Sequence, residues 1–242
     1  MLLTIKLIAI LKVLNCLIYL SNCQLTPNQT VEQTLVTTLL NGYEAKIRPS
    51  ELVEVSIAVQ LKQIVGIDEK NQVMTSSCYI EQWWEDSRLA WNQSHYNDIQ
   101  VINLLLKNIW APDTNILNSA NGDGYFKINA DFSYVNVKYT GEVYFVTPAL
   151  SLQTKCALNV TKYPFDSQTC SIILSTWSFS SNKVTYLIND TYIDTYSDYT
   201  PHNVWEVSNS SNIVPIDSSD RNPYEGNYYI IWYEIYNYYR QS

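Results

Sequence analysis

The feature that most constrains the fold is an alternation of apolar and polar residues that begins shortly after position 50. In ELVEVSIAVQLKQIV, residues 51–65, the alternating apolar positions are Val53, Val55, Ile57, Val59 and Leu61. Because successive side chains of a strand point to opposite faces, this pattern predicts a strand with one buried face. The turn-like GIDEKNQ and a second strand-like run, VMTSSCYIEQWWED, follow directly. Residues 51–84 are therefore predicted to form a long β-hairpin.

The rest of the chain favours strands as well, apart from one short helix. At 30–41, Leu35, Leu39 and Leu40 recur at helical spacing, and Pro49 ends the pattern. After the hairpin, strand-like segments alternate with turn sequences such as APDTN and NSANGDG. Tyr and Trp, which suit half-buried pleated surfaces, are abundant. About ten strands without a linker or repeat predict one all-β domain, a β-sandwich with a short N-terminal α-helix.

The first 23 residues, MLLTIKLIAILKVLNCLIYLSNC, differ from the rest of the chain. They are apolar, have Lys6 near the start and end in small or polar residues, which is typical of a signal peptide. Residues 1–23 are therefore predicted to be removed, leaving one domain over residues 24–242. The alternative is a signal anchor that stays in place, because Lys12 and Asn15 interrupt the apolar core. No later stretch offers eighteen apolar residues, so no membrane span is expected in the remaining sequence.

Sequons and cysteines fit a secretory route. Five Asn-X-Ser/Thr sequons predict glycosylation at Asn28, Asn92, Asn159, Asn189 and Asn209. In an oxidising compartment, Cys156 and Cys170 are predicted to pair. Cys78 is then left over, either as a buried thiol or as a partner for another chain, and its apolar surroundings in the sequence favour the buried thiol.

Charge and motif content exclude several functions. The net charge is −8, and it becomes −10 when Lys6 and Lys12 leave with the signal peptide. Such a chain disfavours nucleic acid and anionic membranes, and favours cationic ligands or simple solubility. The two histidines, His95 and His202, lie in no ligand cluster, and HExxH, GxSxG, P-loop and CxxC motifs are absent. We therefore expect neither an enzyme nor a metal or cofactor site.

Tryptophans are the residues most suited to binding a cation. Trp177, in LSTWSF, stands where a predicted strand runs into a loop, so its ring is a candidate for cation–π contact with an amine. Trp84, Trp91 and Trp110 are instead predicted to belong to the core of the sandwich.

Several of these motifs together resemble one known family. LLNGYEAKIRP, QIVGIDEKNQV, WWEDSRLAWN, WAPD and LSTW are joined by two cysteines that enclose thirteen residues with a YPFD tetrad. This set resembles the extracellular ligand-binding domain of the Cys-loop receptors, the pentameric neurotransmitter-gated ion channels, and is most similar to their nicotinic branch. The resemblance implies a helix capping a twisted sandwich of ten strands, assembled as five subunits with ligand sites between neighbours.

The resemblance also implies the residues of such a site. Trp177 and Tyr224 correspond to ligand-binding aromatics of the principal side. On the complementary side, the corresponding residues are Tyr79, Tyr144 and Val146.

This sequence departs from the family pattern at two further positions. Two usual aromatic positions fall on Leu117 and near Asp217, and the adjacent cysteine pair of the acetylcholine-binding loop is absent. These departures leave open a subunit without a working principal face. Asp217 is an alternative partner for a primary amine.

The resemblance assigns the disulfide loop to coupling. Its tip contains Tyr163, Pro164, Phe165 and Asp166, and in the receptors this apolar tip presses on the membrane-spanning part. Ligand-driven movement would thus reach the pore.

The implied function is the ligand-binding domain of a channel subunit at the extracellular face of the plasma membrane. Its expected partners are identical or related subunits in a pentamer, a small amine-type ligand, and a transmembrane domain outside this sequence. The alternatives are a secreted pentamer similar to the acetylcholine-binding proteins, or an auxiliary subunit. The sequence names neither the ligand nor the ion selectivity.

Overall fold

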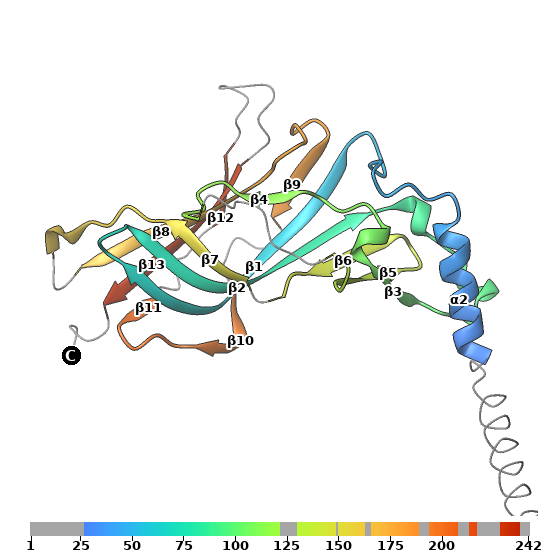
Figure 1. Ribbon diagram of the computed structural model, residues 1–242, viewed down its shortest axis with the longest axis horizontal. Coiled ribbons are helices and arrows are strands. Elements are labelled where there is room, and N and C mark those ends of the chain that lie inside the picture. Colours follow the sequence, from blue (N-terminus) through green and yellow to red (C-terminus); the bar gives the residue numbers. More distant parts are fainter. Residues whose placement is uncertain are drawn as a thin grey trace, which may run out of the picture.

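The computed structural model describes residues 27–121, 130–148, 150–162, 166–188, 194–207, 213–216 and 228–237. They form two β-sheets and one α-helix, α2 (Pro27–Leu40), which lies at one end of the long axis (Figure 1). The predicted all-β sandwich with an N-terminal helix is therefore confirmed. The predicted signal peptide, residues 1–23, lies outside the described residues. Among the described helices, none is long and apolar enough to cross a membrane.

The larger sheet has eight strands and the smaller has five. The larger sheet runs in the order β10-β1-β2-β6-β5-β3, while β9 also pairs with β1 and β7 with β2. Its strands are β1 (Val53–Asp68), β2 (Val73–Glu85), β3 (Val101–Leu105), β5 (Tyr134–Lys138), β6 (Glu142–Val146), β7 (Leu150–Lys155), β9 (Val184–Ile188) and β10 (Asp194–Thr200).

The smaller sheet runs in the order β11-β13-β8-β4, and β12 pairs with β13. Its strands are β4 (Thr114–Ile116), β8 (Ser167–Thr176), β11 (Trp205–Val207), β12 (Ile213–Ile216) and β13 (Tyr228–Asn237). Four single-turn 3-10 helices complete the described elements: η1 (Ser87–Leu89), η2 (Gln93–His95), η3 (Leu106–Asn108) and η4 (Val160–Lys162).

The described strands exceed the expected ten because long strands pair with two shorter ones in succession. β2 pairs with β7 along its first half and with β6 along its second half. At the junction, the Ile80 amide donates to the Thr147 hydroxyl oxygen (2.8 Å), and the Thr147 amide donates to the Ile80 carbonyl (2.9 Å). A side chain thus replaces one bond of the ladder and divides the segment into β6 and β7. β1 likewise pairs in parallel with β9 and then β10.

The long hairpin formed by β1 and β2 is the centre of the larger sheet, as the alternation predicted. The five alternating apolar residues of β1, from Val53 to Leu61, are at most 2% exposed. On β2, Met74, Ile80 and Trp84 point to the same side, while the intervening residues are half-buried on the outward face. The hairpin turn lies at the end of the molecule away from α2 (Figure 1).

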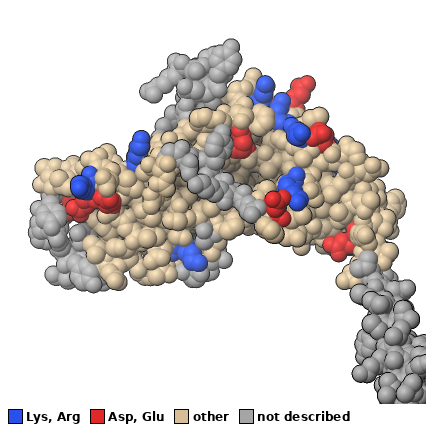
Figure 2. Space-filling view, viewed as in Figure 1, with Lys and Arg blue, Asp and Glu red and all other residues tan. Residues whose placement is uncertain are grey.

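The core lies between the two sheets. Ile172 and Leu174 of β8 and Ile235 of β13 are fully buried against the inward face of the hairpin. Trp84, Trp91 and Trp110 are 3%, 8% and 3% exposed, which confirms their predicted place in the core. Charged side chains are dispersed over the visible face rather than gathered in one patch (Figure 2).

The helix starts three residues earlier than predicted and packs by one side. Pro27 opens it, where the missing amide proton and the fixed φ of proline cost nothing. Leu35 is fully buried, and Leu39 and Leu40 are partly buried against the core. Gly42, with φ of +77°, then turns the chain away in a conformation that favours glycine.

Candidate ligand-binding site

Three of the predicted site residues lie together on the outward face of the larger sheet. Tyr79 belongs to β2, and Tyr144 and Val146 belong to the neighbouring β6. In the register of these strands, Trp83 is opposite Tyr144 and Glu81 is opposite Val146. Because positions 79, 81 and 83 alternate with buried ones, their side chains share one half-buried face with those of β6.

Two neighbours on this face were not predicted from the sequence. The Trp83 ring stacks on the Tyr144 ring, with centroids 5.1 Å apart and an angle of 24° between the planes. Partial burial raises the pKa of the Glu81 carboxyl, and a hydrogen bond with Tyr144 opposes that rise. The signal for both residues was their spacing from Tyr79, two residues for Glu81 and four for Trp83, which places them on the face of the predicted ligand contact.

The side-chain ammonium of Lys62 lies against part of this outward face. Lys62 of β1 donates a hydrogen bond to the Tyr79 hydroxyl (3.3 Å), and its Nζ lies 5.6 Å from the centroid of the Tyr79 ring. This distance is within cation–π range. A cationic ligand at Tyr79 would therefore compete with Lys62.

Beside this cluster, the outward face is hollowed into an open trough of about 1060 Å³. Trp83 lines it together with three carboxylates, Glu54, Glu85 and Glu142. Lys138 forms a salt bridge with Glu142 (2.6 Å). The remaining carboxylates and the indole make the trough better suited to a cation than to an anion.

Trp177 lies elsewhere, at the end of the smaller sheet. It follows β8 directly, and its side chain is 62% exposed, as expected for a ring where a strand runs into a loop. Asp113 holds the backbone there. Its carbonyl accepts from the Trp177 amide (3.4 Å), and its Oδ2 accepts from the Ser178 amide (2.6 Å). Trp177 therefore lies at the end of the smaller sheet. The outward-face cluster, formed by Tyr79, Glu81, Trp83, Tyr144 and Val146, lies on the larger sheet of the same subunit.

A buried polar network supports the segment that leads to Asp113. The Tyr43 hydroxyl donates to Asp86 Oδ2 (2.6 Å) and accepts from the Trp110 amide (3.0 Å). Arg88 donates to the same Asp86 oxygen (2.7 Å) and to the Tyr43 hydroxyl (2.9 Å). Burial and the Asp86 acceptor raise the pKa of Tyr43 well above its usual range. The backbone of Trp110, three residues before Asp113, is thus linked through the Tyr43 hydroxyl to the buried Asp86 carboxylate.

The remaining predicted ligand contacts are only partly described. Tyr224 and Asp217 lie outside the described residues. Leu117, at the position of a usual family aromatic, follows β4 and is 38% exposed, and its amide donates to the Ile173 carbonyl (2.8 Å).

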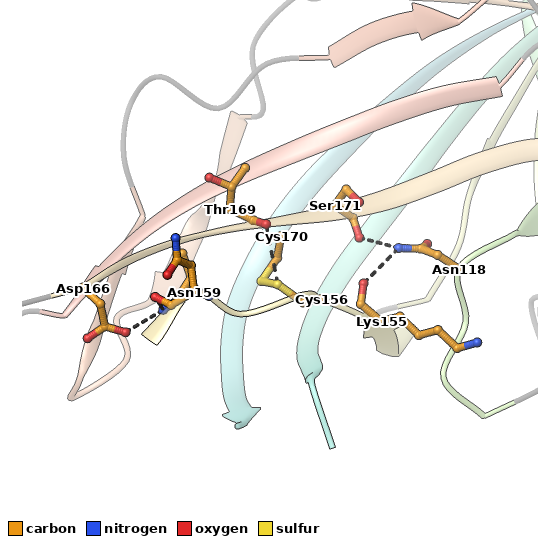
Figure 3. The surroundings of a disulfide bond; sticks show 9 residues. Asn118, Lys155, Cys156, Asn159, Asp166, Thr169, Cys170 and Ser171 are labelled. Atoms are coloured by element: carbon orange, nitrogen blue, oxygen red, sulfur yellow. Dashed lines mark hydrogen bonds between the residues drawn. A yellow bond between two sulfur atoms is a disulfide. The ribbon is translucent and has the colours of Figure 1, made fainter. Parts of the chain in front are cut away.

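The predicted disulfide is present between Cys156, just after β7, and Cys170 of β8 (Figure 3). Their Cα atoms are 5.0 Å apart. The bond therefore joins a strand-end of the larger sheet to a strand of the smaller one. Cys78 is fully buried and takes no part in a disulfide, as predicted, and its thiol lies 3.6 Å from the Ser76 hydroxyl oxygen.

Within the disulfide loop, a glutamine connects the two limbs. Gln168 Nε2 donates to Asp166 Oδ2 (2.5 Å) and to the Asn159 carbonyl (3.1 Å), and its Oε1 accepts from the Asn159 amide (2.8 Å). Asp166 is 5% exposed, so little of its surface is available for contact outside the loop. The other tip residues, Tyr163, Pro164 and Phe165, lie outside the described residues.

Two of the five sequon asparagines have described side chains. Asn92 and Asn159 are both exposed, as glycosylation requires. Asn28 lies in the first turn of α2, with its side chain outside the description, and Asn189 and Asn209 lie outside the described residues. Within the described ranges, no group of three or more His, Cys, Asp and Glu side chains could hold a metal ion.

Comparison with known proteins agrees with this geometry. Residues 32–235 match the family model described as the neurotransmitter-gated ion-channel ligand binding domain. The chain is 33% identical over 183 residues to neuronal acetylcholine receptor subunit beta-3 of Gallus gallus, covering 74% of this chain and 39% of that protein.

Two further relatives give similar values. Acetylcholine receptor subunit beta-like 1 of Drosophila melanogaster is 34% identical over 209 residues, covering 83% of this chain and 39% of its own length. Neuronal acetylcholine receptor subunit beta-2 of Rattus norvegicus is 30% identical over 210 residues, covering 84% and 40%. The chain thus spans about two fifths of the length of these relatives.

The matched family consists of channel ligand-binding domains, in agreement with the prediction that the chain is not an enzyme. The match covers most of α2, the central hairpin, the disulfide loop and most of β13. The chain therefore belongs to the family of neurotransmitter-gated ion-channel ligand-binding domains, as its resemblance to the Cys-loop receptors predicted.

Proposed function

We propose that this chain is the extracellular ligand-binding domain of a channel subunit that binds a small cationic amine between neighbouring subunits. In this proposal residues 1–23 direct the chain into the secretory pathway, and the domain stands at the extracellular face of the plasma membrane. Identical or related subunits complete a ring of five. A membrane domain outside this sequence receives the movement of the disulfide loop.

The observation that carries the proposal is the exposed Trp177 ring on a backbone clamped by Asp113. A tryptophan that is 62% exposed leaves most of its apolar surface in water, which a ligand or a partner subunit would cover. Because Asp113 binds the amides at 177 and 178, the ring stands on a fixed support. A fixed indole face is the group that binds ammonium ions most strongly among aromatic side chains.

The second half of the proposed site is the outward-face cluster of Tyr79, Tyr144 and Val146, extended by Trp83 and Glu81. Since Trp177 belongs to the other sheet, one subunit offers two half-sites on different surfaces. An interface between two subunits would join Trp177 of one to the cluster of the next. This division supports an assembled ring as the binding form.

The test is calorimetry on the assembled ectodomain with a panel of choline, acetylcholine and primary amines. We expect Trp177→Ala and Tyr79→Ala each to weaken binding about tenfold, since one well-placed ring contributes roughly 0.5–2 kcal/mol. Phe132→Ala is the matched control, because this ring is 79% exposed and precedes β5. The control should leave affinity within twofold.

Three outcomes would change the assignment. If Trp177→Ala has no effect while Tyr79→Ala abolishes binding, the chain is an auxiliary subunit that supplies only the complementary side. Ligand binding by a stable dimer would refute the proposal that the binding form is a ring of five subunits. Binding by a secreted pentamer whose transcript has a confirmed stop after Ser242 would favour the soluble binding-protein alternative.

A further inference from the structure

The segment that follows β4, residues 117–120, connects the two sheets beside the disulfide. On one side, the Leu117 amide donates to the Ile173 carbonyl of β8 (2.8 Å). On the other side, the Ala120 amide donates to the Gln153 carbonyl of β7 (2.8 Å). Because β8 belongs to the smaller sheet and β7 to the larger, this strap, residues 117–120, crosses from one sheet to the other.

The side chain of Asn118 supplies the central contacts of the strap (Figure 3). Its Nδ2 donates to the Ser171 carbonyl (2.8 Å) and, more weakly, to the Lys155 carbonyl (3.4 Å). Its Oδ1 accepts from the Ile173 amide (3.0 Å). Its backbone carbonyl also accepts from the Lys155 amide (2.9 Å). Only a carboxamide presents both a donor pair and an acceptor in this arrangement.

The positions of these contacts relate Asn118 to the disulfide. Lys155 precedes Cys156 and Ser171 follows Cys170, so the carboxamide bridges residues that adjoin the two bonded cysteines. At its base, the disulfide loop is therefore closed both by the sulfur bond and by Asn118. The sulfur bond is permanent, whereas the hydrogen bonds can break and re-form.

The opposite end of the same short segment holds Trp177. Asp113, immediately before β4, binds the amides at 177 and 178. Between Asp113 and Asn118, the three β4 residues Thr114, Asn115 and Ile116 are at most 6% exposed. Five residues of extended chain span roughly 16 Å. The middle three residues of this segment are the buried strand β4, which can transmit a displacement because close-packed interiors do not absorb it.

We propose that Asn118 is a positioning residue that couples the Trp177 backbone, through β4, to the strands that enter the disulfide loop. The assignment of Trp177 to a ligand rests on the proposed function, but the mechanical link does not. Replacing the amide by a carboxylate would point a second acceptor at the Ser171 and Lys155 carbonyls. Asn118→Asp therefore removes the hydrogen bonds to Ser171 and Lys155 with almost no change in the size of the side chain.

A double-mutant cycle on the folded chain tests the link without any ligand. The variants are Asp113→Ala, which removes the acceptor of the Ser178 amide, Asn118→Asp and their combination. The readout is amide hydrogen exchange over residues 150–156 and 168–174. We expect each single variant to speed exchange there about fivefold, the equivalent of one lost hydrogen bond. If the two ends are linked, the double variant exchanges no more than twofold faster than Asn118→Asp alone. Independent effects that multiply to about 25-fold would overturn the proposal.

Two controls keep the cycle decisive. Asn103→Asp makes the same chemical change on an exposed position of β3, and its effect should multiply with that of Asp113→Ala. If Asn118→Asp does not fold, Asn118→Ala replaces it, because alanine removes the bonds without adding charge. If the Asn118 variant multiplied with the Asp113 variant in exchange rate as the Asn103 variant does, a specific link through Asn118 would be contradicted.

A separate arm distinguishes this proposal from the proposed function. Tetramethylammonium, the simplest quaternary cation, is titrated into the assembled ectodomain. Binding should slow exchange over residues 168–174 in the wild type and leave it unchanged in Asn118→Asp, although both bind. Slowing that persists in the variant would overturn the role of Asn118. Absence of tetramethylammonium binding would count against the proposed function while the ligand-free cycle still decides the link.

Discussion

At the scale of single residues, the most demanding position is Tyr43. Its hydroxyl is shared by a carboxylate with no exposed surface, Asp86, by the Arg88 guanidinium and by the Trp110 amide. The guanidinium also lies over the Tyr43 ring, 4.3 Å from its centroid. One phenol thus connects the segment after α2 to the segment before β4.

Tyr43→Phe should lower the free energy of unfolding by about 1–3 kcal/mol, because it leaves the buried Asp86 oxygen and the Trp110 amide short of one partner. Urea denaturation with an unchanged slope would measure it. Tyr139→Phe, at a tyrosine that is 41% exposed, is the control and should change stability by less than about 0.5 kcal/mol. Equal effects of the two variants would show that the network contributes no stability.

The same residue predicts a response to alkaline pH. Because folding raises the pKa of Tyr43 above its ordinary value of 10.0, the folded state favours the protonated phenol. The stability that the protonated Tyr43 phenol contributes is complete below pH 10 and is lost as the pH rises toward the pKa of the folded state. Stability of the wild type should therefore fall more steeply above pH 10 than that of Tyr43→Phe. Parallel curves in denaturation titrations would contradict this.

Lys62 gives a second prediction at this scale, conditional on an amine binding at Tyr79. Lys62→Met should raise the affinity for a monovalent amine about three- to tenfold, because the ring loses its internal cation while the apolar stem remains. Calorimetry on the assembled ectodomain would measure this change. Lys107→Met, at an exposed lysine bridged to Asp131, is the matched control. A weaker affinity in Lys62→Met would mean that the lysine assists binding.

At the scale of elements, the turn between β5 and β6 fixes the outward-face cluster against the loop after β2. The Asp86 amide donates to the Gly141 carbonyl (2.9 Å), and the Gly141 amide closes the turn onto the Lys138 carbonyl (2.8 Å). Gly141 has φ of +91°, and a Cβ there would lie 2.7 Å from the Asp86 carbonyl oxygen. Both the conformation and the space therefore require glycine.

Gly141→Ala should cost about 2–4 kcal/mol, combining the strain of positive φ with a clash against backbone. Gly42→Ala is the matched control, because Gly42 also has positive φ but no atom within 4 Å of the added methyl group. It should cost only about 1 kcal/mol. Thermal unfolding of both variants would separate the cost of positive φ from the cost of the clash with the Asp86 carbonyl. Equal losses would show that the β5–β6 turn moves away from Asp86 without penalty.

At the scale of the whole molecule, the two sheets are closed at the end away from α2 by the disulfide and the strap. The disulfide joins residues 14 apart in sequence, so it closes a small loop as well as linking the sheets. The Cys156 amide also donates to the Gln72 carbonyl at the hairpin turn (2.8 Å). The turn of the central hairpin and the disulfide loop therefore form one connected end of the molecule.

Replacing both Cys156 and Cys170 by alanine should lower the free energy of unfolding by about 3 kcal/mol, the value for a loop of about 15 residues. Urea denaturation would measure the loss, and mass mapping of unreduced peptides would verify the pairing. Cys78→Ala is the control: it should leave the peptide map unchanged. A bridge between Cys78 and either partner in the wild type would refute the pairing.

The sequence by itself determined the elements whose signal is local. Strict alternation fixed the central hairpin, because a one-residue slip would expose all the apolar residues from Val53 to Leu61. Helical spacing located α2 to within three residues. Size and apolarity assigned Trp84, Trp91 and Trp110 to the core, and motif spacing identified the disulfide and the family. Tyr79, Tyr144 and Val146 were assigned to one side of a site only through the resemblance to the family.

Only the tertiary structure decided which side chains meet across elements. Trp83 stacks on Tyr144, and Lys62 lies over Tyr79, because of the register between three strands that no local pattern encodes. Likewise, Asn118 contacts Lys155 and Ser171 only because the turn after β4 passes between the two sheets. Contacts of this kind join residues far apart in the chain. Their partners are therefore set by packing of the whole domain rather than by the residues beside them in sequence.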